Sequence, residues 1–213
     1  MNITILISSE NHPINGTLTS WINRNSCNHQ IQLVRSRNDL VGGDILFLIS
    51  CGEVIDHDTR AKFKKTLVIH ASDLPKGRGW SPHIWEILHG AKYLTVSLLQ
   101  AEDKVDTGAI WKKVRIKIPE TAVWQEINQL LFEKELALMD FAIENMPGIT
   151  SYEQLDIKPS YWPKRRPEDS ELDIHKSIDQ QFNLLRISDN ERYPAFFCKD
   201  GRKFKLTMEP MDE

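Results

Sequence analysis

The sequence has few cysteines, and they form no recognisable pattern. Only Cys27, Cys51 and Cys198 occur in 213 residues, and none are spaced as a C-x-x-C pair. Their number and spacing indicate neither a disulfide framework nor a zinc site, so no metal site is predicted. We expect ordinary thiols in a reducing compartment.

Long apolar runs and an excess of charge are also missing. No run approaches the roughly 20 apolar residues of a membrane helix. The N-terminal MNITILISSE lacks the positive region and long apolar core of a signal peptide. The formal net charge of −3 is not typical of a protein whose main partner is a polyanion. The sequence therefore predicts a cytoplasmic protein with neither a membrane nor a nucleic acid as its partner.

The sequence does contain an alternation of short apolar runs with segments of helical spacing. Hydrophobic residues make up 40% of the chain, enough for a sizeable core. The apolar runs predict buried strands at 2–8, 31–36, 42–52, 65–70 and 94–100. Helical spacing predicts helices at 16–25 and 81–90, the second with Ser81 as its cap, Pro82 in its first turn and Gly90 at its end. This alternation predicts an open, mostly parallel α/β sheet of the doubly wound type.

Two further elements complete the main domain, which we place at residues 1–148. Strict alternation of apolar and polar residues at 114–118 predicts a half-exposed, antiparallel edge strand. A long apolar stripe at 121–148 predicts the longest helix, with Gly148 at its end.

The composition changes after this helix, so residues 149–213 are predicted to form a linker and a small C-terminal α+β appendage. The segment 151–173 contains three prolines and many charges, and we interpret it as a linker held in place by its contacts. A short helix is predicted at 175–188. A β-hairpin is predicted at 193–208, with Asp200-Gly201 as a two-residue turn.

A candidate site follows from the end of the fourth predicted strand. In open α/β sheets ligands bind outside the carboxyl ends of the strands, and His70 ends this strand. Asp103 and Asp106 follow the next strand, so a histidine and an aspartate can meet as an acid–base pair. A lone histidine at a strand end is more often structural, and this alternative stays open.

The turn after His70 has a composition that suits an anionic ligand. In PKGRG, Gly77 and Gly79 permit a close backbone approach, and Lys76 and Arg78 supply cations. Such a turn, taken alone, is usually a solvated loop.

Together these segments resemble the folate-dependent formyltransferase family. VIHASDLPKGRG at 68–79 resembles the family's N-x-H-x-S-x-L-P segment, VDTGAI at 105–110 resembles its later D-T-G, and the likeness covers roughly residues 44–206. It implies a Rossmann-like catalytic domain that takes N10-formyltetrahydrofolate as co-substrate and formylates a primary amine. It makes His70 a catalytic base or electrostatic stabiliser and Asp106 its partner. The residues it implies for the folate pocket are Ser50, Cys51, Gly52, Val54, Leu99 and Asp103.

One departure from the family pattern concerns the oxyanion. The family's catalytic asparagine falls at Val68, which cannot donate a hydrogen bond. Loss of one such donor typically lowers the rate by ~10²–10³. Ser72, a backbone N–H or a water are the substitutes considered, and the sequence does not distinguish them.

The resemblance extends to the acceptor. Residues 161–174 and 182–206 resemble segments of sugar-nucleotide N-formyltransferases, whereas the tRNA enzymes carry a longer β-barrel domain. This implies a nucleotide-linked amino sugar, specifically a 4-amino-4,6-dideoxyhexose of a glycan pathway such as O-antigen or pseudaminic acid synthesis, and a homodimeric enzyme. The implied acceptor contacts are Lys76, Arg78, Trp80, Tyr193 and Phe196. Two alternatives stay open: a methionyl-tRNA formyltransferase-like enzyme, and an inactive folate- or nucleotide-binding module.

Overall fold

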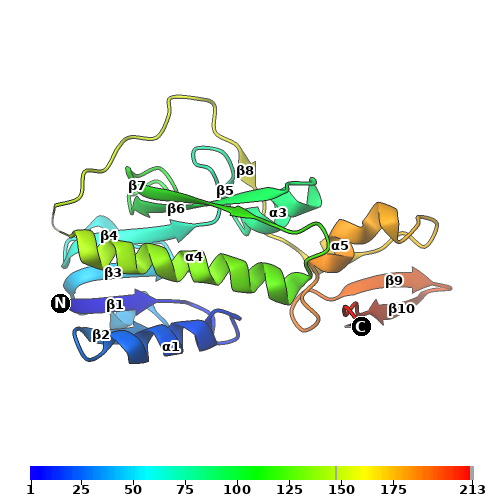
Figure 1. Ribbon diagram of the computed structural model, residues 1–213, viewed down its shortest axis with the longest axis horizontal. Helices are drawn as coiled ribbons and strands as arrows, with labels where there is room; N and C mark the ends of the chain where they lie inside the picture. Colours follow the sequence, from blue (N-terminus) through cyan, green and yellow to red (C-terminus); the bar gives the residue numbers. More distant parts are fainter. Residues whose placement is uncertain (147, 212–213) are drawn as a thin grey trace.

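A computed structural model describes residues 1–146 and 148–211, and its centre is a six-stranded sheet in the order β2-β1-β3-β4-β6-β7 (Figure 1). The strands are β1 (Asn2–Leu6), β2 (Gln30–Val34), β3 (Gly43–Ile49), β4 (Phe63–His70), β6 (Tyr93–Gln100) and β7 (Ile110–Lys117). The first four are parallel, whereas β6 is antiparallel to β4 and β7 is antiparallel to β6. The predicted mostly parallel sheet with an antiparallel edge strand is confirmed.

The helices cover the two faces of this sheet unevenly. Helices α1 (Asn15–Asn25), α3 (Pro82–Leu88) and α4 (Trp124–Asn145) contribute to one large core cluster on a single face. The opposite apolar face is a smaller cluster, and only the short α2 (His57–Arg60) and the 3₁₀ turn η1 (Arg37–Asp39) lie in the connections around it. This differs from the doubly wound expectation because the chain between β3 and β4 contains only four helical residues.

The predicted start of α3 needs one correction. Ser81 occupies the N-cap position but makes no side-chain capping bond, because its backbone is left-handed, with φ of 45°. Pro82 does begin the helix, and Gly90 follows it with a φ of 83°.

The C-terminal part forms small elements beside the main sheet. They are β8 (Tyr161–Trp162), the 3₁₀ turns η2 (Pro167–Ser170) and η3 (Asp179–Gln181), α5 (Phe182–Arg186), β9 (Ala195–Lys199) and β10 (Arg202–Leu206). The helix predicted at 175–188 forms only over α5 and the η3 turn before it. The hairpin is confirmed: β9 and β10 pair antiparallel, and Asp200 and Gly201 have φ of 51° and 78°, as a two-residue turn requires.

The chain after α4 runs back across the molecule to β8, so it reaches the carboxyl end of the main sheet (Figure 1). Tyr152 forms an isolated bridge with Ile110. The two residues of β8 pair in parallel with β5 (Arg78–Gly79). The segment predicted to be a linker is thus a partner of the loop that follows His70. No helix among the described residues has the length and apolar character needed to cross a membrane.

Candidate active site

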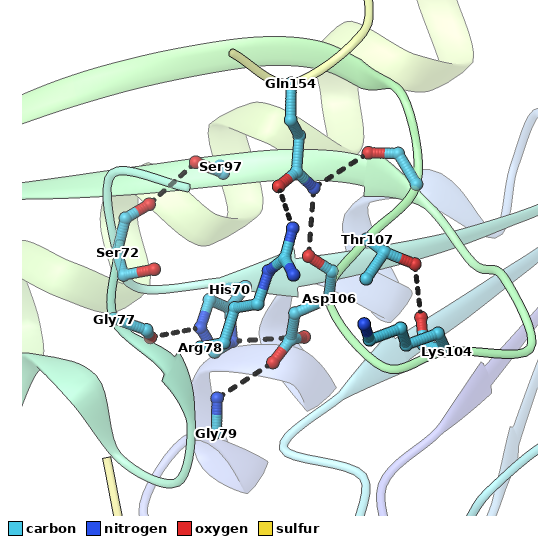
Figure 2. Close-up of polar contacts among 11 residues, drawn as sticks. His70, Ser72, Gly77, Arg78, Gly79, Ser97, Lys104, Asp106, Thr107 and Gln154 are labelled. Atoms are coloured by element: carbon cyan, nitrogen blue, oxygen red, sulfur yellow. Dashed lines mark hydrogen bonds and ion pairs between the residues drawn. The ribbon is translucent and has the colours of Figure 1, made fainter. Parts of the chain in front are cut away.

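His70 and Asp106 lie side by side at the end of β4. His70 Nδ1 is 3.5 Å from Asp106 Oδ1, and both side chains are buried. Asp106 Oδ2 accepts a hydrogen bond of 3.0 Å from the backbone N–H of Gly79, so the carboxylate bridges two loops. The two residues that the sequence predicts as a pair are therefore brought together (Figure 2).

The route by which Asp106 reaches His70 differs from the expected one. Because β6 is antiparallel to β4, its last residue pairs with Leu67 rather than extending past the end of β4. The loop begins there, where the Ala101 N–H donates to the Thr66 carbonyl. It then returns along β4, and Asp106 takes a left-handed backbone conformation with φ of 58°.

The second nitrogen of His70 is also occupied. His70 Nε2 lies 2.8 Å from the carbonyl oxygen of Gly77. A ring nitrogen donates only when it carries a proton, so this bond requires the proton on Nε2. A second proton on Nδ1 would give an imidazolium with one N–H facing a carbonyl and the other facing a carboxylate. This arrangement suits a histidine that stabilises developing charge.

The loop after His70 is held by the segment that follows α4. Ser160 accepts the Gly77 N–H through its Oγ, at 2.8 Å, and the Arg78 N–H through its carbonyl, at 2.9 Å. Gln154 Oε1 accepts from Arg78 Nη2 at 2.8 Å. Gln154 Nε2 donates to the carbonyl of Asp106 at 2.9 Å (Figure 2). Gln154 and Ser160 are site residues that the sequence analysis missed, because no motif marks either one.

The predicted cations of the PKGRG turn have different surroundings. Arg78 is buried, and its guanidinium bonds Gln154 and Tyr161, so its contacts lie within the protein. Lys76 is exposed, and no ion pair to it occurs among the described residues. Gly79 is required by packing, because a β-carbon there would collide with the carbonyl oxygen of Trp162.

Trp80 is the aromatic side chain that the turn presents to solvent. It is 45% exposed and lies between two left-handed residues, Gly79 with φ of 98° and Ser81 with φ of 45°. The Lys164 ammonium is 4.9 Å from the centre of its ring. A β-carbon on Gly52 would lie 3.7 Å from the indole, so Trp80 also contacts the loop after β3.

Val68 and Ser72 are the two side chains considered for the hydrogen bond to the oxyanion. Val68 is half-buried and lies two residues before His70 on the same face of β4. Ser72 has no exposed surface, its carbonyl accepts from Ser97 Oγ at 2.7 Å, and its own Oγ has no partner among the described residues. This burial argues against the suggestion that the Ser72 hydroxyl contacts an oxyanion.

Glu86 is a further titratable group at this loop. Its Oε1 lies 3.3 Å from the position that a β-carbon on Gly77 would occupy. Burial, and then the charge of Asp73, raise the pKa of Glu86 to about 7. The Glu86 carboxyl group, with a pKa of about 7, thus lies next to Gly77.

The residues that the resemblance implies for the folate pocket differ in how exposed they are. Ser50, Gly52 and Val54 are exposed after β3, and Gly52 N–H donates to Ser8 Oγ at 3.0 Å. Cys51 is partly buried, and burial raises the pKa of its thiol. Leu99 has no exposed surface and packs in the core beside Val68.

Asp103 lies on the other loop implied for this pocket. Its side chain is largely exposed and pairs with Arg60 at 2.6 Å.

Backbone strain marks the same region. The described residues include four non-glycine residues with positive φ, and three of them, Ser50, Ser81 and Asp106, lie in the loops around His70. Such conformations cost roughly 1–3 kcal/mol each and persist where the surroundings impose them, which is common at functional sites.

The C-terminal aromatic candidates lie in the small element. Tyr193 is half-buried, with the Arg165 guanidinium 5.2 Å from its ring centre. Phe196 is in β9, with the Lys203 ammonium 4.6 Å from its ring centre. Both rings are thus already packed against cations of the same element.

The comparisons with known proteins identify the family. Residues 25–143, more than half of the chain, match the model of the formyl transferase family, and the chain belongs to this family. A curated relative is the bifunctional polymyxin resistance protein ArnA of Wigglesworthia glossinidia brevipalpis, which is 24% identical over 198 residues. The match covers 86% of this chain but only 30% of the length of ArnA.

Solved structures share the fold. Methionyl-tRNA formyltransferase from Clostridium thermocellum has a TM-score of 0.82 at 19% identity, covering 100% of this chain and 94% of that chain. A sugar N-formyltransferase from Shewanella sp FDAARGOS_354 has a TM-score of 0.74 at 14% identity, covering 100% and 99%. HypX from Aquifex aeolicus in complex with tetrahydrofolic acid has a TM-score of 0.75 at 19% identity, covering 97% of this chain and 37% of HypX.

Proposed function

We propose that this protein transfers a formyl group from N10-formyltetrahydrofolate to the primary amine of a nucleotide-linked amino sugar. The observation that carries the proposal is the His70–Asp106 pair, whose atoms approach to 3.5 Å beside an exposed, strained loop of a formyl transferase fold. Membership of the family and the tetrahydrofolic acid in the related HypX structure support the donor. The sugar N-formyltransferase among the structural relatives supports the acceptor.

In the proposed reaction the amine nitrogen attacks the formyl carbon. A carbon–nitrogen bond forms to the amine, the bond from the formyl carbon to N10 breaks, and the amine proton ends on N10. His70, held between the Gly77 carbonyl and Asp106, stabilises the developing charge of the tetrahedral intermediate electrostatically, and Asp106 orients the ring. Because Val68 offers no donor and Ser72 is buried, we assign the missing contact to a backbone N–H of the loop or to a water.

The loop that follows His70 presents groups that suit a nucleotide. Trp80 presents an exposed indole face, on which a pyrimidine can stack. Lys76, four residues earlier, supplies a cation for the pyrophosphate. All three candidate rings have a cation beside them, but Trp80 is exposed whereas Tyr193 and Phe196 are half-buried, so we place the base on Trp80.

A methionyl-tRNA formyltransferase-like activity is the second candidate, favoured by the TM-score of 0.82. The match also covers 94% of that chain, so chain length does not separate the two activities. The net charge of −3 favours the smaller acceptor, since a tRNA would need many cationic contacts to its phosphates.

The test incubates the protein with the formyl donor and a panel of UDP- and dTDP-linked 4-amino sugars, followed by mass spectrometry for one added formyl group. We expect a formylated sugar nucleotide. Lys76→Ala should raise KM more than it lowers kcat, because a phosphate contact remote from the reacting atoms acts in both ground and transition states.

Two results would count against this assignment. Formylation of charged initiator tRNA, with no sugar nucleotide in the panel modified, would favour the second candidate. Ligand binding without any formylated product would favour an inactive binding module. Lys203→Ala, in the C-terminal hairpin, is the matched control for Lys76→Ala.

A further inference from the structure

A cavity of about 330 Å³ is lined by none of the residues assigned to formyl transfer. Three segments that are distant in sequence form it: the loop between β1 and α1, the first turn of α4, and the turn after α5. The lining residues are Asn11, Pro13, Trp124, Gln125, Asp189, Asn190, Glu191 and Arg192. Its volume is at the lower end of small-molecule sites, roughly 300–1,000 Å³, and suits a ligand of one ring.

The turn after α5 is rigidly built. Asp189 is almost fully buried, and its Oδ1 accepts the N–H groups of Glu191 at 3.0 Å and Arg192 at 3.2 Å. Its Oδ2 accepts from Arg192 Nε at 2.5 Å. This clamp fixes the guanidinium through Nε, and within the described residues no hydrogen bond involves its two Nη groups. Arg192 thus offers organised donors at the wall of the cavity.

The other walls supply an aromatic face and neutral polar groups. Trp124 is half-buried at the start of α4 and contributes an indole. Asn11, Gln125 and Asn190 contribute side-chain amides, each of which both donates and accepts hydrogen bonds. The exposed Glu191 adds an acceptor. A site with one aromatic face and several paired donors and acceptors matches a ring that is apolar on its faces and hydroxylated at its edge.

His12, which lies between the lining residues Asn11 and Pro13 in the sequence, is neutral. His12 Nδ1 accepts the Ile14 N–H at 3.3 Å, so its proton resides on Nε2. Burial and the nearby Arg192 lower the pKa of His12 to about 4. Arg192 is therefore balanced locally by Asp189 and Glu191, which disfavours a ligand recognised mainly by negative charge.

We propose that this cavity binds a single neutral monosaccharide ring, with the ring stacked on Trp124 and its hydroxyls bonded to Arg192 and the side-chain amides. None of the lining residues belongs to the His70–Asp106 pair or to its supporting contacts. The site is thus a recognition site rather than part of the reacting centre, and the proposal does not depend on formyl transfer.

The experiment uses the full chain labelled with 5-fluorotryptophan and no folate. The chain has six tryptophans, and Trp124→Phe assigns the resonance of interest. Glucose, galactose and N-acetylglucosamine are titrated separately at millimolar concentration, with sodium acetate as an anion probe. We expect at least one sugar to shift the Trp124 resonance, saturably, while the Trp80 resonance stays unchanged.

Two variants make the result decisive. Gln125→Ala changes an exposed side chain that makes no hydrogen bond within the described part of the chain, so the fold is expected to persist. Arg192→Ala removes the clamped guanidinium. Each should weaken the apparent affinity by about tenfold, the effect of losing one good contact, whereas Arg202→Ala in the hairpin should change nothing. The proposal is overturned by no shift with any sugar, by a shift that neither cavity variant weakens, or by an equal shift with acetate.

Discussion

Two groups of buried polar side chains in this protein have contrasting surroundings. At the end of β4, His70, Asp106 and Arg78 each contact groups from a distant segment, although Ser72 Oγ and Arg78 Nε lack partners among the described residues. On the core-facing side of α4, the Nδ2 of Asn128 and the Oε2 of Glu135 are buried, and neither has a partner in the described part of the chain. A buried polar side chain that bonds groups from a distant segment holds those groups in position. A buried polar side chain without such partners does not.

The largest effect is expected when His70, at the centre of the partnered group, is replaced. His70→Asn should lower kcat/KM for formyl transfer by about 10²–10⁴, the range for a positioned acid–base group. The ring makes two contacts at a strand end, so the melting temperature should change little. Steady-state kinetics and thermal unfolding test both parts. Wild-type turnover in this variant would remove His70 from the mechanism.

The next prediction concerns how the free energy of unfolding depends on pH through Glu135. Burial raises the pKa of Glu135 from 4.5 to about 8, so the folded state binds a proton that the unfolded state has lost in this interval. The contribution of Glu135 to the free energy of unfolding should therefore fall as pH rises from 4.5 to 8, whereas His12 and His83, whose pKa values are lowered, contribute with the opposite sign below pH 6.5. Glu135→Gln stays neutral and should be more stable than wild type by on the order of 5 kcal/mol at the upper end.

Urea unfolding across this pH range provides the measurement for Glu135. Glu133→Gln, an exposed site on the same helix, is the matched control and should follow wild type at every pH, because it retains Glu135. A stability difference between Glu135→Gln and wild type that does not grow with pH would show that Glu135 has a charged partner.

A smaller effect should follow from removing a supporting contact at the site. Gln154 connects Arg78 to the Asp106 backbone, so Gln154→Ala should cost about 1–2 kcal/mol of unfolding free energy by leaving buried groups unpaired. We expect a roughly tenfold fall in kcat because Asp106 is positioned less precisely. Glu153→Ala, an exposed neighbour, should match wild type in both assays. Equal losses in the two variants would indicate a general effect of this segment.

The smallest change is expected at Asn128. Asn128→Ala removes a buried donor that has no partner among the described residues, so the lost packing is offset, and stability should stay within about 1 kcal/mol of wild type. Denaturant midpoints suffice for this comparison. A loss above about 2 kcal/mol would reveal a bound water or another partner.

How much of the molecule the sequence predicts depends on the range of the interactions. Asp200-Gly201 predicts its hairpin correctly because a two-residue turn is decided by two adjacent backbones. His70 and Asp106 are found through a motif at the ends of strands. The antiparallel direction of β6 is missed because it depends on pairing with β4.

The contacts of Gln154 and Ser160 lie beyond the reach of sequence patterns. Each depends on where a segment without regular periodicity crosses the sheet. The roles of the individual site residues, and the boundary between residues 148 and 149, remain predictions.

The pairing of β8 with β5 has a consequence for how the protein is made. A chain leaving the ribosome exposes His70 and its loop long before Ser160 and Trp162 emerge. Until then the Gly77 and Arg78 amides lack their acceptors, and Gly79 has no strand beside it. The core of the sheet is able to form early, whereas the site waits for the last quarter of the polypeptide. A nascent chain stalled before Ser160 should therefore be folded at its centre and incomplete at its site.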